Sequence, residues 1–200
     1  MTKKNKQSSW TPAKKPKSSS QTMDRIVYGG SIVFIVAIFA IMGLNAWSKR
    51  PIDIRDIESI DPRSRQHLET VAYDTEDGVP PSADSHSPTW QNCGIYASPV
   101  RAENALHALE HGAVWITYQP NLPLEQVAEL QAIARSSTQF LLSPYPNLES
   151  PIILTSWAFR LRVDNADDKR IGQFIRNYEN DESAPEPGAR CSGGVGQPIG

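Results

Sequence analysis

The chain has 200 residues and a formal net charge of −2, but its charges are distributed unevenly. Residues 1–25 hold seven basic residues and one acidic residue, whereas residues 51–200 hold 11 basic and 21 acidic residues, a balance of −10. A domain with this excess of negative charge lacks the positive surface on which nucleic acids and anionic lipid headgroups bind. The composition therefore excludes a nucleic-acid partner for residues 51–200.

Residues 1–25 form a basic N-terminal segment. Six lysines stand among Ser, Thr, Gln and Pro, and apolar side chains are almost absent. A segment of this composition cannot bury enough apolar surface to fold by itself. We predict a disordered basic tail that lies in the cytoplasm.

Residues 26–47 contain no charged side chain. With a helical rise of about 1.5 Å per residue, such a segment spans roughly 33 Å, which is sufficient to cross a bilayer. Basic residues are more numerous before this segment than after it, and the cytoplasmic flank of a membrane helix carries the excess of Lys and Arg. We predict a single-pass helix in the cell membrane, with the N-terminus cytoplasmic and the C-terminal domain extracytoplasmic.

A cleaved signal peptide is the alternative interpretation of residues 26–47. Their apolar run is longer than the usual core of a signal peptide, and no small-residue cleavage site follows closely. The sequence Trp47-Ser48-Lys49-Arg50 is also a poor context for cleavage. These features favour a retained anchor.

Residues 48–78 are rich in Pro, Asp and Ser and show no sustained hydrophobic period. We predict a linker with one short helix at residues 62–68. The segment Val79-Pro80-Pro81 is expected to be extended, because a residue before proline is pushed out of the helical region. The exported domain is placed at residues 79–195 and a short tail at residues 196–200.

Within the exported domain the hydrophobic pattern alternates between helical and strand periods. The predicted elements are a helix at 101–111, a strand at 113–118, a helix at 124–136, strands within 139–142 and 151–163, and a helix at 167–178. Gly112 follows the first helix directly and is suited to end it. The fold class predicted is α+β, with a three- to four-stranded sheet and about three helices.

Two cysteines, Cys93 and Cys191, are the only ones in the chain. Both fall in the part predicted to lie outside the cytoplasm, where thiols are oxidised, so we predict one disulfide between them. The alternative makes Cys93 a thiolate metal ligand near His86.

The segment from His107 to Gly112 places two histidines and one glutamate within about one helical turn. Residues three and four apart share a helix face, so His107, Glu110 and His111 can converge on one point. His86, in the loop before the helix, could add a third imidazole. We predict that these four residues bind copper or zinc, for which nitrogen-rich ligation is suited.

Other interpretations of these histidines stay open. Histidines near a helix end often interact with the helix dipole only, and those of this domain could be structural groups of an assembly module that binds a membrane protein. His67, in the linker, is expected to be solvated and without a role. The pattern His107-x-x-Glu110-His111 also matches inverted zincin metallohydrolases, but here Gly112 ends the helix and a strand follows at once, so we do not expect an enzyme.

Further motifs accompany the histidine run. They are, in chain order, Pro80-Pro81-Ser82, His86, Trp90, Gly94-Ile95-Tyr96 and the segment from His107 to Val114. This combination resembles a bacterial family of membrane-anchored proteins catalogued only as a domain of unknown function, over about residues 70–195. The resemblance implies a basic cytoplasmic tail, one anchor and an exported domain, and it implies no activity.

Overall fold

The computed structural model describes residues 13, 36–40, 42, 54–73 and 78–199, and the chain divides into two compact units, Met1–Arg50 and Pro51–Gly200. Most of the predicted tail at 1–25 and most of the predicted membrane helix at 26–47 lie outside the described residues, although 36–40 and 42 are helical. In the part of the chain that is described, no helix combines the length and the apolar character that crossing a membrane requires. The membrane anchor therefore stays a prediction.

The second unit is built on one mixed six-stranded sheet with the strand order β1-β6-β5-β3-β4-β2. Its strands are β1 (Ile57–Ser59), β2 (Gly94–Ile95), β3 (Val114–Tyr118), β4 (Phe140–Pro144), β5 (Ile152–Ser156) and β6 (Phe159–Val163). The pairs β2 with β4 and β4 with β3 are parallel, whereas β3 with β5, β5 with β6 and β6 with β1 are antiparallel. The predicted α+β class is confirmed.

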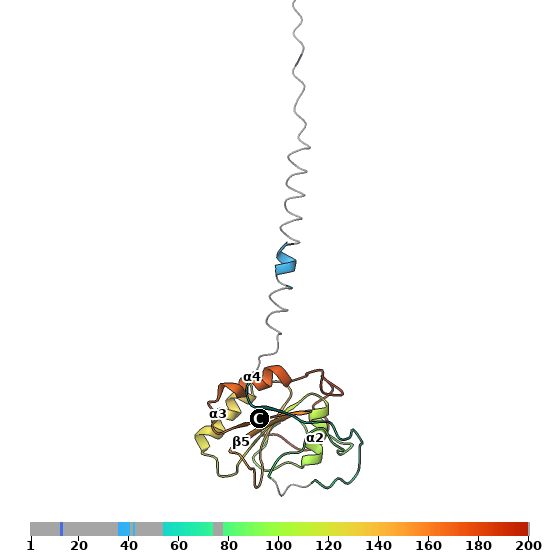
Figure 1. Ribbon diagram of the computed structural model, residues 1–200, viewed down its shortest axis with the longest axis vertical. Helices are drawn as coiled ribbons and strands as arrows, with labels where there is room; N and C mark the ends of the chain where they lie inside the picture. The colour runs from blue at the N-terminus through green and yellow to red at the C-terminus, as the bar shows by residue number, and fades with distance from the viewer. Residues whose placement is uncertain (1–12, 14–35, 41, 43–53, 74–77, 200) are drawn as a thin grey trace, which may run out of the picture. The chain divides into compact units, whose positions relative to one another are not determined.

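Three helices cover the two faces of this sheet: α2 (Ala102–Glu110), α3 (Leu124–Ala134) and α4 (Lys169–Tyr178). Successive side chains of a strand point to opposite faces, so Ile116 packs with Leu130 of α3 and Phe174 of α4, while Trp115 packs with Leu106 of α2. Figure 1 shows α3 and α4 on one side of β5 and α2 on the other. Two separate hydrophobic cores result, and α2 belongs to the second.

The sheet is larger than the three or four strands predicted. Strands β1 and β2 were missed because each has only two or three residues and no alternating pattern of its own. The candidate at 151–163 is two strands, which turn at Ala158 with φ of 66°. The predicted helix at 62–68 is absent: the one regular feature of that segment is the isolated bridge of His67 with His86. The placement of the exported domain at residues 79–195 stays a prediction.

The end of α2 is fixed by Gly112, which has φ of 93°. Its N–H donates to the carbonyl of Leu109, and the N–H of Ala113 donates to that of Ala108, which is the Schellman arrangement. A Cβ at position 112 would lie 2.9 Å from the side-chain oxygen of Asn180. Both the backbone conformation and the close neighbour therefore require glycine here.

The C-terminal segment closes over this end of α2. The N–H groups of Glu186 and Gly188 donate to the carbonyls of Glu110 and His111, which a helix terminus leaves without internal partners. The predicted disulfide between Cys93 and Cys191 is confirmed, so Cys93 is not a free thiolate. The chain is thereby tied across 98 residues of sequence.

Replacing both cysteines by serine should lower the unfolding free energy of residues 51–200 by about 2–5 kcal/mol, because the unfolded chain regains the freedom of a long loop. Urea denaturation under oxidising conditions measures the difference. A reductant should destabilise the wild type by a similar amount and leave the double variant unchanged. Equal midpoints for the wild type and the double variant would show that the tail needs no tether.

Candidate metal centre

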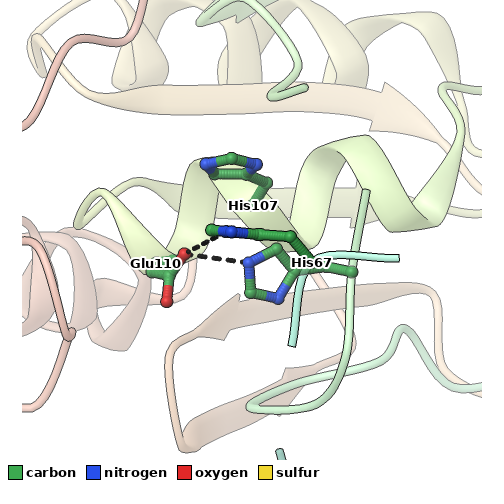
Figure 2. Close-up of side chains that lie close together, drawn as sticks. His67, His107 and Glu110 are labelled. Atoms are coloured by element: carbon green, nitrogen blue, oxygen red, sulfur yellow. Dashed lines mark hydrogen bonds and ion pairs between the residues drawn. The ribbon is translucent and has the colours of Figure 1, made fainter. Parts of the chain in front are cut away.

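Three imidazoles and one carboxylate meet beside α2. His107 and Glu110 come from α2, His86 from the loop before it, and His67 from the extended segment that follows β1. One ligand atom from each of these four residues lies within 4.8 Å of the others. Figure 2 shows the His67 and His107 rings one above the other, beside the Glu110 carboxylate. We call these four residues the His/Glu cluster.

Backbone hydrogen bonds bring His67 to this cluster. His67 and His86 form a parallel bridge, in which His86 N–H donates to the carbonyl of Gln66 and Leu68 N–H donates to that of His86. The two rings therefore lie 4.7 Å apart, edge to face. His67 is solvated as expected, with 43% of its side chain exposed, but it also contacts the other members of the cluster.

The loop that carries His86 is clamped to α2. The side-chain amide of Asn104 donates to the Ser87 hydroxyl oxygen at 3.1 Å and to the Thr89 carbonyl at 2.5 Å. In addition, Ser87 N–H donates to the carbonyl of Glu103 in the first turn of α2. These contacts fix the position of the loop relative to the helix, and with it the position of His86 relative to His107.

Backbone carbonyls set the tautomers of two cluster histidines. Nδ1 of His86 lies 2.8 Å from the carbonyl oxygen of Asp84, and Nδ1 of His107 lies 2.7 Å from that of Ser87. A carbonyl oxygen only accepts, so both Nδ1 atoms carry the proton. In the neutral ring the lone pair is then on Nε2, which is the arrangement that metal-binding histidines show.

Glu110 is the only carboxylate in the cluster and is 3% exposed. Its Oε2 lies 2.8 Å from Nε2 of His86 and 3.1 Å from Nε2 of His67. Two acceptor atoms cannot face each other at 2.8 Å, so a proton or another cation must stand between Glu110 and His86. The contact therefore contains either a shared proton or a bound cation.

Burial acts on the acid–base behaviour of the cluster. Burial by itself raises the pKa of Glu110, but hydrogen bonds and charge interactions with His86 and His67 outweigh it and lower the pKa below the ordinary value. Burial lowers the pKa of His107 to about 4, because the neighbouring His111 and His86 add to this effect and the hydrogen bond with Ser87 offsets it only in part. At neutral pH His107 is neutral and Glu110 is ionised.

His111, the fourth predicted ligand, is not among the four residues that converge. Its Nδ1 lies 2.7 Å from the carbonyl oxygen of Arg190, and its Nε2 faces the carboxylate of Glu186 at 3.6 Å. Its ring contacts those of His107 and Trp90, at centroid distances of 4.6 and 5.1 Å. The geometry thus joins His111 to the C-terminal segment and places His67 in the cluster instead.

The donor set of the cluster suits a transition metal. A tetrahedral zinc ion has nitrogen and oxygen ligands at about 2.0–2.2 Å, so its donor atoms lie roughly 3.3 Å from one another. The two separations at Glu110, 2.8 and 3.1 Å, are close to this value. Because the remaining donor atoms also fall within 4.8 Å, the cluster could hold an ion after small side-chain movements.

The fold and the cluster define a disulfide-bonded α+β domain with a His₃Glu group of which three members are buried. The chain belongs to the family described as "Protein of unknown function (DUF3105)", whose model matches residues 64–193. No curated protein and no solved structure matches the chain significantly. The match includes all four cluster residues and both cysteines, and a disulfide of this kind favours an extracytoplasmic domain.

The low pKa of His107 predicts a loss of stability in acid. Between its ordinary value of 6.5 and about pH 4, the unfolded chain binds a proton that the folded chain does not. The stabilising contribution is complete above pH 6.5 and is lost as the pH falls to about 4, with a magnitude on the order of 3 kcal/mol. Glu110 acts with the same sign at lower pH.

Urea titrations of chelator-treated residues 51–200 at pH 7 and pH 5 measure this dependence. The variant His107→Gln, which cannot titrate at this position, should lose less stability over the same interval. An identical pH dependence in the wild type and the variant would contradict the assignment.

Proposed function

We propose that this protein is a single-pass membrane protein whose extracytoplasmic domain binds a transition metal, copper or zinc. The ligands are His67, His86, His107 and Glu110. The observation that carries the proposal is the convergence of three imidazoles on a buried carboxylate at the end of a helix. A helix C-terminus disfavours negative charge, and so does burial, so a bound cation would stabilise Glu110.

Copper and zinc are the metals that best suit these donors. Imidazole nitrogen is a borderline ligand that binds both, whereas magnesium and calcium prefer sites made of oxygen atoms only. Both cysteines are in the disulfide, which leaves no thiolate to favour a softer ion such as copper(I). The choice between zinc and copper(II) depends on coordination geometry, which spectroscopy of the loaded protein can determine.

The arrangement supports binding rather than hydrolysis. In the inverted zincin pattern both histidines of the motif hold the zinc ion, and the glutamate between them activates water. Here His111 is not among the residues that converge, its Nε2 faces the carboxylate of Glu186, and Glu110 contacts His86 and His67 directly. Glu110 is therefore better placed as a ligand than as a general base.

A second function is favoured by one specific observation. The hydrogen bonds from His86 and His67 already satisfy Glu110 when both Nε2 atoms carry protons, so the cluster could be a structural polar network. The domain would then be an assembly module that binds a membrane-protein partner. Metal titration separates the two functions.

His107→Ala should lower the affinity for Zn²⁺ and Cu²⁺ by at least about 100-fold, because it removes a direct ligand. His111→Ala is the matched control: the two residues lie one helical turn apart and are 5% and 4% exposed, so both substitutions open a similar cavity. Competition titration against a chromogenic chelator measures the affinities, and elemental analysis gives the stoichiometry. Equal loss in both variants, or no bound metal in the wild type, would favour the structural network.

The proposed topology predicts that alkaline phosphatase fused after Gly200 is active in a bacterial host, because this enzyme folds only where its disulfides can form. The same fusion made with a reporter that needs the cytoplasm should be inactive. The reverse pair of results would place the domain in the cytoplasm and contradict the orientation inferred from the basic residues that precede residue 26.

A further inference from the structure

The histidines beside α2 differ in how they are held. Nδ1 of each of His86, His107 and His111 lies 2.7–2.8 Å from a backbone carbonyl oxygen. Within the described residues, the ring of His67 has no such contact, and its one hydrogen bond joins Nε2 to Glu110. His67 is therefore the one cluster histidine whose ring orientation is not fixed by the backbone.

His67 also differs from the other cluster residues in its exposure to solvent. His86, Glu110 and His107 are 0%, 3% and 5% exposed, whereas the side chain of His67 is 43% exposed. The His67 ring stacks on that of His107 and so lies between the buried donors and the solvent. A metal ion bound by the cluster would consequently have three donors inside the domain and one at its surface.

The segment that carries His67 is attached more weakly than the others. Its backbone hydrogen bonds to other segments are the two of the bridge to His86, one from Arg63 N–H to the carbonyl of Ala83 and one from Ile60 N–H to that of Ala158. In addition, the exposed Arg63 guanidinium lies 3.9 Å from the carboxylate of Asp84. Residues 60–66 belong to no helix or strand, in contrast to His107 and Glu110 on α2. Movement of His67 away from the cluster therefore breaks few contacts, while movement of the other donors disrupts the second core.

We propose, on the basis of the metal site proposed above, that His67 is a gate through which the metal ion is exchanged as cargo with an acceptor outside the domain. In the exchange the bond between the metal and Nε2 of His67 breaks, and its electron pair stays on the nitrogen. A donor atom of the acceptor forms a new bond to the metal from the solvent side, and the remaining three bonds are then transferred in turn. The oxidation state of the metal does not change.

In this mechanism the acceptor takes the position that His67 leaves, which differs from simple leakage of the ion. If release required the buried donors to open first, its rate would not depend on the concentration of the acceptor. If the acceptor enters the position that His67 leaves, the rate must rise with acceptor concentration until the opening of His67 limits it. The acceptor must offer nitrogen, oxygen or sulfur donors small enough to reach one surface position.

The test uses the full-length chain in detergent, loaded with Zn²⁺ or in parallel with Cu²⁺, and mixed with increasing concentrations of pyridylazoresorcinol. This chelator reports release by its colour and takes the place of the acceptor. The variants are His67→Ala and His67→Gln, with Glu69→Ala as control, since Glu69 is exposed on the same segment and is not part of the cluster. Circular dichroism verifies that each variant is folded.

The wild-type rate should rise with chelator concentration and then level off. Both His67 variants should keep one metal ion per chain but release it at least about tenfold faster, without the plateau, because the gate is gone. Glu69→Ala should behave like the wild type. Release that is independent of chelator concentration, or unchanged rates in the His67 variants, would overturn the gate while leaving the metal site intact. Absence of bound metal in the wild type would overturn both proposals.

Discussion

A buried carboxylate at the C-terminal end of a helix is the constraint on which the arrangement of this domain depends. Glu110 is the last residue of α2, where the helix dipole disfavours negative charge, and it is 3% exposed. Burial without a partner would protonate it or unfold the helix end. The segments around residues 67 and 86 supply the partners, and the cost of burying Glu110 is offset only when both are in place.

The other side of the same helix end depends on the C-terminal segment. The N–H groups of Glu186 and Gly188 complete the hydrogen bonds of the last carbonyls of α2, and the carbonyl of Arg190 orients His111. The disulfide at Cys191 holds this segment in place. One helical turn is thus enclosed by the segments around residues 67, 86 and 186–191.

Local patterns in the sequence were sufficient to predict the helix α2 of the second core and the potential ligands that it carries. The period of apolar residues predicted α2, and Gly112 predicted its end, because only a residue tolerant of positive φ continues the chain there. The pair of cysteines predicted the disulfide, since no other cysteine competes for either. His86, His107 and Glu110 were recognised because spacing along a helix and nearness in sequence both act over few residues.

Only the tertiary structure shows that His67, and not His111, lies in the His/Glu cluster. Both are histidines at plausible distances in sequence, but the choice depends on a two-hydrogen-bond bridge to His86 and on a carbonyl of the C-terminal segment, neither of which leaves a periodic signal. The same is true of β1 and β2, whose two or three residues become strands because an existing edge offers them hydrogen bonds. The sequence by itself determined the α+β class, α2 and the disulfide. Short extended segments pair with distant parts of the chain whose backbone N–H and C=O groups would otherwise lack partners. This pairing determined the full sheet and the membership of the His/Glu cluster.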